Sequence, residues 1–198
     1  MTNTNKIRLG LDLDGVVYNF VDEFRTYVST QRRVDPASLA EIDKWEFYLD
    51  WGMTEGEYFE TLQEAAIGGH IFKSGQIYEG AAEAVAEVRD MGFEIVAITA
   101  RKLTDIVLDH QIIYDNTANW LTMNGIEFDE LIVTNNKVGH GLNVLVDDHL
   151  GNVHNFIAAG GKGFIFDRPW NQGSNYDRIM GWDDFPRKLA QLGGMIPA

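Results

Sequence analysis

Two aspartates, two residues apart, are the residues of this chain whose spacing most directly suggests chemistry. Asp12 and Asp14 follow the mainly apolar run 7–11 and precede Gly15. Side chains at positions i and i+2 of a strand point to the same face, so these carboxylates should lie close together at a strand end. Open α/β sheets bind ligands at this edge, and two like charges held there need a cation or a proton to compensate them. The pattern therefore predicts a metal-assisted phosphoryl site.

Polar residues also follow three later strand patterns, and parallel strands would bring all of them to the same edge of a sheet. They are Thr99, Ala100 and Arg101 after 93–98, Lys137 after 130–133, and Asp147 and Asp148 after 143–146. Phosphoryl transfer from a monoester needs a carboxylate nucleophile, a second carboxylate that moves a proton, and a hydroxyl and a cation that hold phosphate oxygens. Further carboxylates hold a metal ion, and such oxygen-rich ligation favours Mg²⁺ over zinc.

The composition excludes several other classes of protein. The 198 residues include 16 basic and 30 acidic side chains, and the net charge of −14 opposes binding to nucleic-acid polymers and to anionic membranes. Because the chain has no cysteine, disulfides, thiolate catalysis and Cys-ligated zinc are excluded. No secretory signal is visible, and no apolar run approaches the roughly 20 residues of a membrane span. We therefore expect a soluble cytoplasmic protein.

Short apolar runs predict the strands that must position these polar residues. Val, Ile and Phe dominate the runs, as expected for strands buried on both faces of a parallel sheet. The strands are predicted at 7–11, 93–98, 130–133, 143–146 and 164–166, with helices around Val85, over about 103–123 and around Phe156. This alternation predicts an α/β fold with three layers, α/β/α, and a parallel sheet.

One long segment interrupts the alternation. Between 19 and 75 no convincing strand pattern appears, and a connection of this length is unusual within a compact α/β unit. We interpret 19–75 as a helical cap inserted after the first motif, on a core formed by 1–18 and 76–198. The segment contains a cluster of aromatic residues that form either a small core of the cap or a wall for a flat nucleobase. The candidates for base binding are Phe20, Trp45, Phe47, Tyr48 and Trp51.

The order of these motifs resembles that of a known group of enzymes. Asp-x-Asp-Gly-Val, then Thr, Lys and Asp-Asp, is similar to the haloacid dehalogenase (HAD) superfamily of phosphatases. The early insertion, Asp-Leu-Asp-Gly-Val-Val and the late sequence Phe-Asp-Arg-Pro-Trp-Asn resemble the 5'(3')-deoxyribonucleotidase family within it. The resemblance spans nearly the whole chain. It implies a Rossmann-like core with a small cap, and Mg²⁺-dependent hydrolysis of deoxyribonucleoside monophosphates.

The resemblance also implies roles for the carboxylates. Asp12 would be the nucleophile that forms an aspartyl-phosphate. Asp14 would protonate the leaving oxygen and later activate the hydrolytic water. The metal ligands would be Asp12, the backbone carbonyl of Asp14, and Asp148, with Asp147 as a supporting partner.

The remaining motif residues would hold the phosphate. The resemblance assigns this role to Thr99 and to Lys137, whose charge would also offset that of the nucleophile. In the mammalian-type enzymes a hydroxyl residue commonly follows the threonine, whereas this chain has Ala100 and then Arg101. Phosphate contacts are therefore expected from Arg101 or from main-chain amides. Arg101 has an alternative role as a helix-start residue paired with Asp105 at i+4.

Other interpretations of the site remain open at the level of sequence. The aspartate pair could belong to a calcium loop, but an EF-hand needs glycine at its sixth position and glutamate at its twelfth. It could belong to a nucleotide-sugar glycosyltransferase, which would not require the later Thr, Lys and Asp-Asp. The substrate could be a sugar or cofactor phosphate, and a non-catalytic nucleotide- or metal-binding module could keep the fold. A homodimer is compatible with the sequence, and neither His140 nor His149 has an assigned role.

Overall fold

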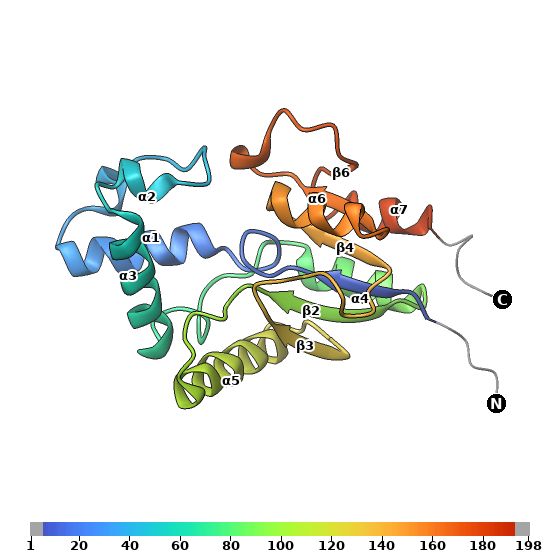
Figure 1. The fold of residues 1–198 in the computed structure, drawn as a ribbon, viewed down its shortest axis with the longest axis horizontal. Helices are drawn as coiled ribbons and strands as arrows, with labels where there is room; N and C mark the ends of the chain where they lie inside the picture. The colour runs from blue at the N-terminus through green and yellow to red at the C-terminus, as the bar shows by residue number, and fades with distance from the viewer. Residues whose placement is uncertain (1–5, 193–198) are drawn as a thin grey trace.

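The computed structural model describes residues 6–192, and a six-stranded parallel sheet forms its centre. The strand order is β3-β2-β1-β4-β5-β6, so β1 lies in the middle and the chain adds strands to either side of it (Figure 1). The strands are β1 (Arg8–Leu11), β2 (Glu94–Thr99), β3 (Glu130–Val133), β4 (Val144–Asp147), β5 (Lys162–Phe166) and β6 (Arg178–Ile179). The predicted parallel α/β fold is therefore confirmed. The sequence did not predict β6, and it placed the ends of four other strands one or two residues away.

Helices cover both faces of this sheet. Three of them, α4 (Ala81–Asp90), α5 (Val107–Met123) and α7 (Phe185–Ala190), bury apolar side chains in the larger core with one face of the strands. On the other face, α6 (Leu150–Ala158) packs against β4 and β5, and its Phe156 contacts a smaller cluster that contains Ile98 and Leu145. Ile95 and Ala97 lie in the larger core, because successive side chains of a strand alternate between faces. The sheet is therefore buried on both sides.

The segment between the first motif and α4 forms helices of its own, as the sequence predicts. They are α1 (Phe20–Arg32), the short η1 (Pro36–Ser38), α2 (Phe47–Asp50) and α3 (Glu55–Ile67). The side chain of Asn19 caps α1, and a capping box between Thr54 and Glu57 begins α3, which satisfies backbone N–H groups that a helix start leaves unpaired. These helices lie beyond the carboxyl end of the sheet, on the side opposite the beginning of β1 (Figure 1).

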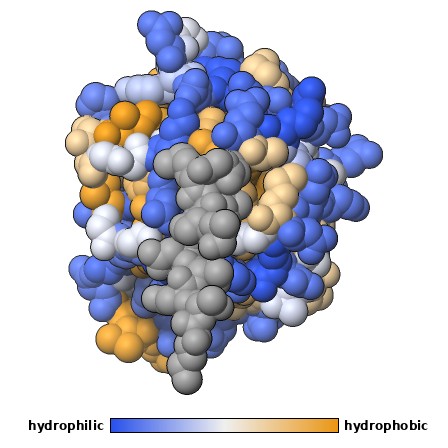
Figure 2. Space-filling view, turned by 90° about the vertical axis from the view of Figure 1, so that its right-hand side faces the viewer, coloured by the Kyte–Doolittle hydropathy of each residue, from blue (hydrophilic) through white to orange (hydrophobic). Residues whose placement is uncertain are grey.

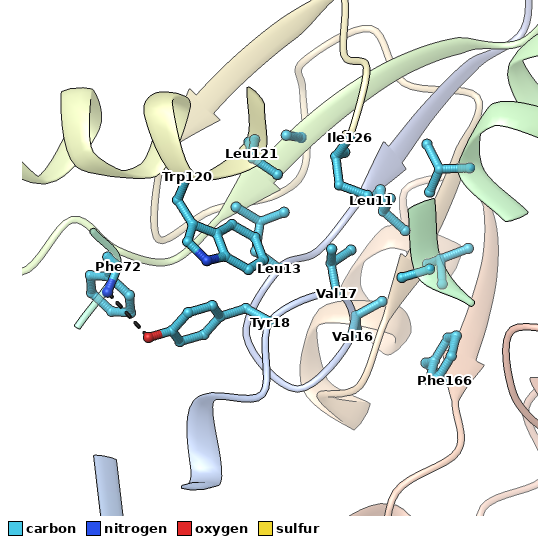
Figure 3. Close-up of a cluster of buried hydrophobic side chains, with 14 of the residues drawn as sticks. Leu11, Leu13, Val16, Val17, Tyr18, Phe72, Trp120, Leu121, Ile126 and Phe166 are labelled. Carbon is cyan, nitrogen blue, oxygen red and sulfur yellow. Dashed lines mark hydrogen bonds between the residues drawn. The ribbon is translucent and has the colours of Figure 1, made fainter. Parts of the chain in front are cut away.

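A tight loop after β1 connects the sheet to this helical segment. Leu13, Val16, Val17 and Tyr18 are fully buried in it, and Tyr18 packs edge-on against Trp120 of α5 (Figure 3). Backbone N–H groups of residues 16–18 donate to the carbonyl of Leu13. The loop is therefore a packed part of the core, which fixes the positions of Asp12 and Asp14.

The opposite end of the molecule has a different character. Figure 2 looks onto the side of the molecule where β1 begins, and hydrophilic residues dominate it around isolated apolar ones. Among the residues that the structure describes, no helix is long and apolar enough to cross a membrane.

Candidate active site

The sheet brings the predicted polar residues together at its carboxyl edge. Asp12 follows β1, Thr99 ends β2 and Asp147 ends β4, while Lys137 lies in the loop between β3 and β4. All four of these side chains are buried, as is that of Asp148. Because β1 pairs with both β2 and β4, residues from distant parts of the sequence meet around the end of one central strand.

Lys137 lies between two of the buried carboxylates. Its Nζ is 2.6 Å from Oδ1 of Asp12 and 2.6 Å from Oδ2 of Asp147. Burial by itself lowers the pKa of this lysine, but the two adjacent carboxylates outweigh burial and raise its pKa, so the ammonium stays charged. Asp147 also accepts hydrogen bonds from the Nδ2 of Asn152 and from the backbone N–H of His149. The oxygens of Asp147 are therefore well provided with donors.

For Asp12, in contrast to Lys137, burial outweighs the neighbouring opposite charge. The pKa of Asp12 is raised to about 7, mainly by burial; Lys137 lowers this pKa, and the charges of Asp147 and Asp14 raise it. The ionised form of such a buried carboxylate is poorly solvated and needs a nearby cation to stabilise it. A carboxylate with so strongly shifted a pKa is a candidate reactive group.

Asp148 differs from Asp147 because one of its oxygens has no partner. Its Oδ2 accepts a hydrogen bond of 2.9 Å from Nε1 of Trp170, but the buried Oδ1 is unpaired. Burial raises the pKa of Asp148 well above the ordinary value, and the neighbouring carboxylates of Asp12 and Asp147 add to the shift. An unpaired buried oxygen among like charges fits a cation ligand.

A divalent ion fits this group of residues. Asp12, Asp147 and Asp148 each offer an oxygen, and the three oxygens lie within 4.8 Å of one another. Because oxygen donors alone suit Mg²⁺, the donor set agrees with the metal that the sequence predicts. Of the paired acids, Asp148 has the unpaired oxygen, whereas Asp147 is occupied by Lys137 and Asn152.

Gly15 and Arg168 hold the first motif against the acidic pair. Gly15 has φ +79°, and a Cβ at this position would lie 2.1 Å from Oδ2 of Asp148, so only glycine fits there. The Nε of Arg168 donates to the carbonyl of Gly15, and its guanidinium lies 4.0 Å from the ring centroid of Tyr78. The segment 167–171 contains the short helix η2 (Pro169–Asn171), and the side chain of Asn171 donates to the backbone carbonyl of Asp148. The loop therefore borders the site and supports it.

Arg101 lies at the site, but the sequence did not predict its partners. Its Nε and Nη2 donate to the two oxygens of Asp14, at 2.9 and 2.7 Å, and its Nη1 donates to Oγ1 of Thr117. The expected ion pair between Arg101 and Asp105 is not formed, whereas the phosphate contact of Arg101 stays a prediction. Asp105 pairs with Lys102 instead.

A cavity of about 610 Å³ opens above these residues. Its floor includes Asp12, Asp14, Lys137 and Asp148, and the exposed Ala100 and the buried Arg101 also line it. Aromatic residues of the helical segment form much of its wall, namely Phe20, Trp45, Phe47, Tyr48, Tyr58, Phe59 and Phe72. The polar floor and the aromatic wall therefore belong to a single cavity.

The predicted aromatic cluster divides into two sets in the structure. Phe20, Trp45, Phe47 and Tyr48 line the cavity, but Trp51 does not. Trp51 is buried in the core of the helical segment, where it stacks against Phe24 and donates its Nε1–H to the carbonyl of Ala40. Trp51, a candidate for base binding in the sequence, therefore lies in the core of the segment and away from the cavity.

One aromatic residue reaches across to the α/β core. The Trp45 ring, 48% exposed, has its centroid 4.3 Å from that of His149 at the start of α6. Burial lowers the pKa of His149, which favours the neutral imidazole in this contact. This contact joins the helical segment to the acidic side of the site.

Sequence reasoning missed several supporting residues. Thr117, Asn152 and Tyr58 belong to none of the motifs, although Asn152 follows the acidic pair closely, and no pattern marks them as part of the site. Trp170 and Arg168 belong to the late sequence Phe-Asp-Arg-Pro-Trp-Asn that resembles the family, but nothing in that pattern predicts their contacts with Asp148 and Gly15.

Comparisons with known proteins agree with this arrangement. The model of a family described as "5' nucleotidase, deoxy (Pyrimidine), cytosolic type C protein" matches residues 5–191. A curated protein of Chlorobaculum tepidum, named "Putative 5'(3')-deoxyribonucleotidase", is 28% identical over 183 residues, which cover 91% of this chain and 88% of the relative.

Solved structures share the fold at low sequence identity. A haloacid dehalogenase-like family hydrolase from Xanthomonas campestris has a TM-score of 0.59 and 14% identity, covering 99% of this chain and 95% of its own. A HAD family hydrolase from Deinococcus radiodurans, solved with phosphate and sodium, has a TM-score of 0.55 and 14% identity, covering 99% and 100%. YfnB from Bacillus subtilis, solved with magnesium, has a TM-score of 0.57 and 11% identity, covering 93% and 98%.

Proposed function

The chain belongs to the family of the deoxy (pyrimidine) 5'-nucleotidases of cytosolic type C, HAD phosphatases, and from this membership we propose that it hydrolyses deoxyribonucleoside monophosphates. The resemblance to HAD phosphatases that the sequence suggested is thereby confirmed, and the protein is a phosphatase of the nucleotidase type. The deoxyribonucleotide substrate, the metal ion and the covalent mechanism are proposed here in addition to this family membership.

One observation carries the proposal most directly: a buried carboxylate, Asp12, faces Lys137 at the floor of a cavity with an aromatic wall. The ammonium of Lys137 both offsets the charge of Asp12 and offers hydrogen bonds to phosphate oxygens. Thr99 is buried beside Asp14, to which its hydroxyl donates, and it does not itself line the cavity. A dianionic phosphate would therefore find a nucleophile and donors in one place.

The proposed reaction uses the carboxylates in sequence. An Asp12 oxygen attacks phosphorus, and the bond to the nucleoside oxygen breaks while Asp14 gives that oxygen a proton. Asp14 then takes a proton from water as the water oxygen attacks the aspartyl-phosphate, which releases inorganic phosphate and restores Asp12. The geometry that supports these roles is the placement of both aspartates at the cavity floor.

We propose Mg²⁺ as the cofactor. Asp12 and Asp148 would hold it through side-chain oxygens and Asp14 through its carbonyl, with Asp147 in support through Lys137. When bound, the ion would supply positive charge that offsets the negative charge of the phosphoryl group. The structure of YfnB, which shares the fold, contains magnesium, and the three-oxygen cluster of this chain fits such an ion.

The aromatic wall supports a nucleoside as the leaving group. We propose that the 19–75 segment acts as a cap and that Phe20, Phe47 and Tyr48 contact the base, because flat rings stack on a nucleobase at little entropic cost. Trp45 is half exposed and contacts His149, so it would close the cavity from the acidic side. A closed cavity excludes bulk water from the phosphoryl group.

A substrate panel tests the proposal. Deoxy- and ribonucleoside monophosphates with 5' or 3' phosphates, sugar phosphates and cofactor phosphates are compared by phosphate release with Mg²⁺ and with a chelator. We expect the highest kcat/KM for deoxyribonucleotides and no turnover with the chelator. Turnover of sugar phosphates alone would contradict the substrate, and absence of turnover with every compound would indicate a binding module.

A further inference from the structure

Arg101 and Asp14 form an ion pair that none of the roles predicted from the sequence motifs includes. Two nitrogens of the guanidinium contact two carboxylate oxygens, which fixes the plane of the carboxylate as well as its position. Oγ1 of Thr99 lies 3.3 Å from the Oδ2 of Asp14 and adds a third donor. Oδ2 of Asp14 thus accepts from two donors, whereas Oδ1 accepts from Arg101 alone and keeps a lone pair that can take a proton.

Arg101 is itself held rigidly. Its side chain is 1% exposed, and its Nη1 donates to Thr117 of α5, whose hydroxyl in turn donates to the carbonyl of Ile113. The guanidinium lies 3.8 Å from the ring centroid of Phe72 and 4.9 Å from that of Tyr18. Such stacking suits a planar guanidinium and would not hold a lysine ammonium in the same way.

Phe72 occupies its place at a conformational cost. Its φ of +66° lies in the left-handed region, which bulky residues rarely adopt. The backbone N–H of Phe72 donates to the hydroxyl of Tyr18 (Figure 3). Tyr18 in turn donates to the carbonyl of Ser74. These bonds hold the Phe72 ring over Arg101, and Phe72 also lines the cavity. The strained segment therefore contributes to the support of Asp14.

From these contacts we propose that Arg101 is a positioning residue for Asp14 and does not bind the phosphate. All three nitrogens of its guanidinium donate hydrogen bonds to side chains. Two of them bind the carboxylate of Asp14, which moves the proton of the leaving group. The inference rests on the proposed function, in which Asp14 protonates the leaving oxygen and then deprotonates water. Misorientation of one carboxylate would slow both proton transfers, while attack by Asp12 on phosphorus would remain.

Substrates with different leaving groups separate these roles. A nucleoside alkoxide needs a proton as it leaves, whereas p-nitrophenolate leaves without one. For Arg101→Gln we expect the single-turnover rate on a deoxyribonucleotide to fall about 100-fold. The first burst of nitrophenolate from p-nitrophenyl phosphate should stay within about 5-fold of the unsubstituted protein, followed by slow turnover.

Three further variants make the result specific. Arg101→Lys keeps the charge but not the two-point contact, so we expect a loss similar to that of Arg101→Gln. Thr117→Val leaves both charged residues in place and should give a smaller loss with the same dependence on the leaving group, which keeps the test informative if Arg101→Gln fails to fold. Arg89→Gln removes a matched bidentate pair with Asp129, which is remote from the residues that line the cavity, and should leave the ratio between the two substrates unchanged.

A double substitution completes the test. In an Asp14→Asn background, Arg101→Gln should cause no further loss on the nucleotide, because the group that it positions is gone. Equal losses on both substrates, a raised KM with unchanged kcat, or full activity of Arg101→Lys would overturn the inference. If Asp14→Asn hydrolyses the nucleotide normally or Asp12→Asn stays active, the proposed function fails as well. If those two variants behave as proposed and only Arg101→Gln does not, the inference alone is wrong.

Discussion

The Nζ of Lys137 lies 2.6 Å from Oδ1 of Asp12, and both side chains are almost completely buried. The same ammonium contacts Asp147, so one cation compensates two carboxylates that would otherwise repel each other. This relationship ties the stability of the fold to the chemistry of the site, because removal of the lysine charge would leave two buried carboxylates uncompensated.

Replacement of Lys137 should therefore destabilise the protein strongly. We expect Lys137→Met to lower the free energy of unfolding by about 3 kcal/mol, because two buried carboxylates lose their counter-charge. Urea unfolding in the presence of a chelator measures this loss. Lys162→Met, which removes an exposed pair with Asp177, is the matched control and should change stability by less than about 1 kcal/mol. Equal stabilities of the two variants would contradict the electrostatic role of Lys137.

The pKa of Asp12 predicts how stability depends on pH in the absence of metal. Burial raises this pKa from 3.8 to about 7, so between these values the folded protein binds a proton that the unfolded chain has lost. The contribution of Asp12 to stability is thus fully present below about pH 4 and is lost as the pH rises through about 7.

Asp12→Asn isolates this contribution, since asparagine does not titrate. The unfolding free energy of the unsubstituted protein, relative to that of Asp12→Asn, should fall between about pH 4 and pH 7 when measured with a chelator. A difference that is constant over this range, or that increases, would show that Asp12 has an ordinary pKa.

Trp170 should affect the affinity for Mg²⁺ through its hydrogen bond to Asp148. Trp170→Phe keeps an aromatic ring but removes the donor at 2.9 Å, and we expect the Kd for Mg²⁺ to rise about 10-fold. Calorimetric titration with Mg²⁺ measures this directly. Trp182→Phe removes a buried indole N–H that has no partner, so it should leave the Kd unchanged. An unchanged Kd in Trp170→Phe would contradict the proposed role of Asp148 as a ligand.

The positions of the motif residues could be predicted because they depend on local patterns. Runs rich in Val, Ile and Phe predicted five of the six strands, and the parallel α/β rule then placed Asp12, Lys137 and Asp148 at one edge. The two-residue strand β6 and the six-residue helix α7 were not predicted, since elements this short have too few residues to show a period.

The partners of these residues could not be predicted in the same way. The pairing of Arg101 with Asp14 spans 87 positions and depends on how the loop after β2 approaches β1. Trp51 and Phe47 belong to the same aromatic cluster in the sequence, but only the packing of α1 against α2 and α3 decides which ring faces the cavity. Such three-dimensional choices leave no trace in spacing or composition.

In the proposed reaction, Asp12 takes the phosphoryl group. The most direct test of this step is mass spectrometry of acid-quenched Asp14→Asn after incubation with Mg²⁺ and an aryl phosphate, whose leaving group needs no proton. Because this variant lacks the group that activates water, the intermediate should accumulate, and the peptide that contains Asp12 should carry one phosphoryl group. Release of the aryl alcohol with no phosphoryl group on that peptide, or with one on another residue, would contradict the account.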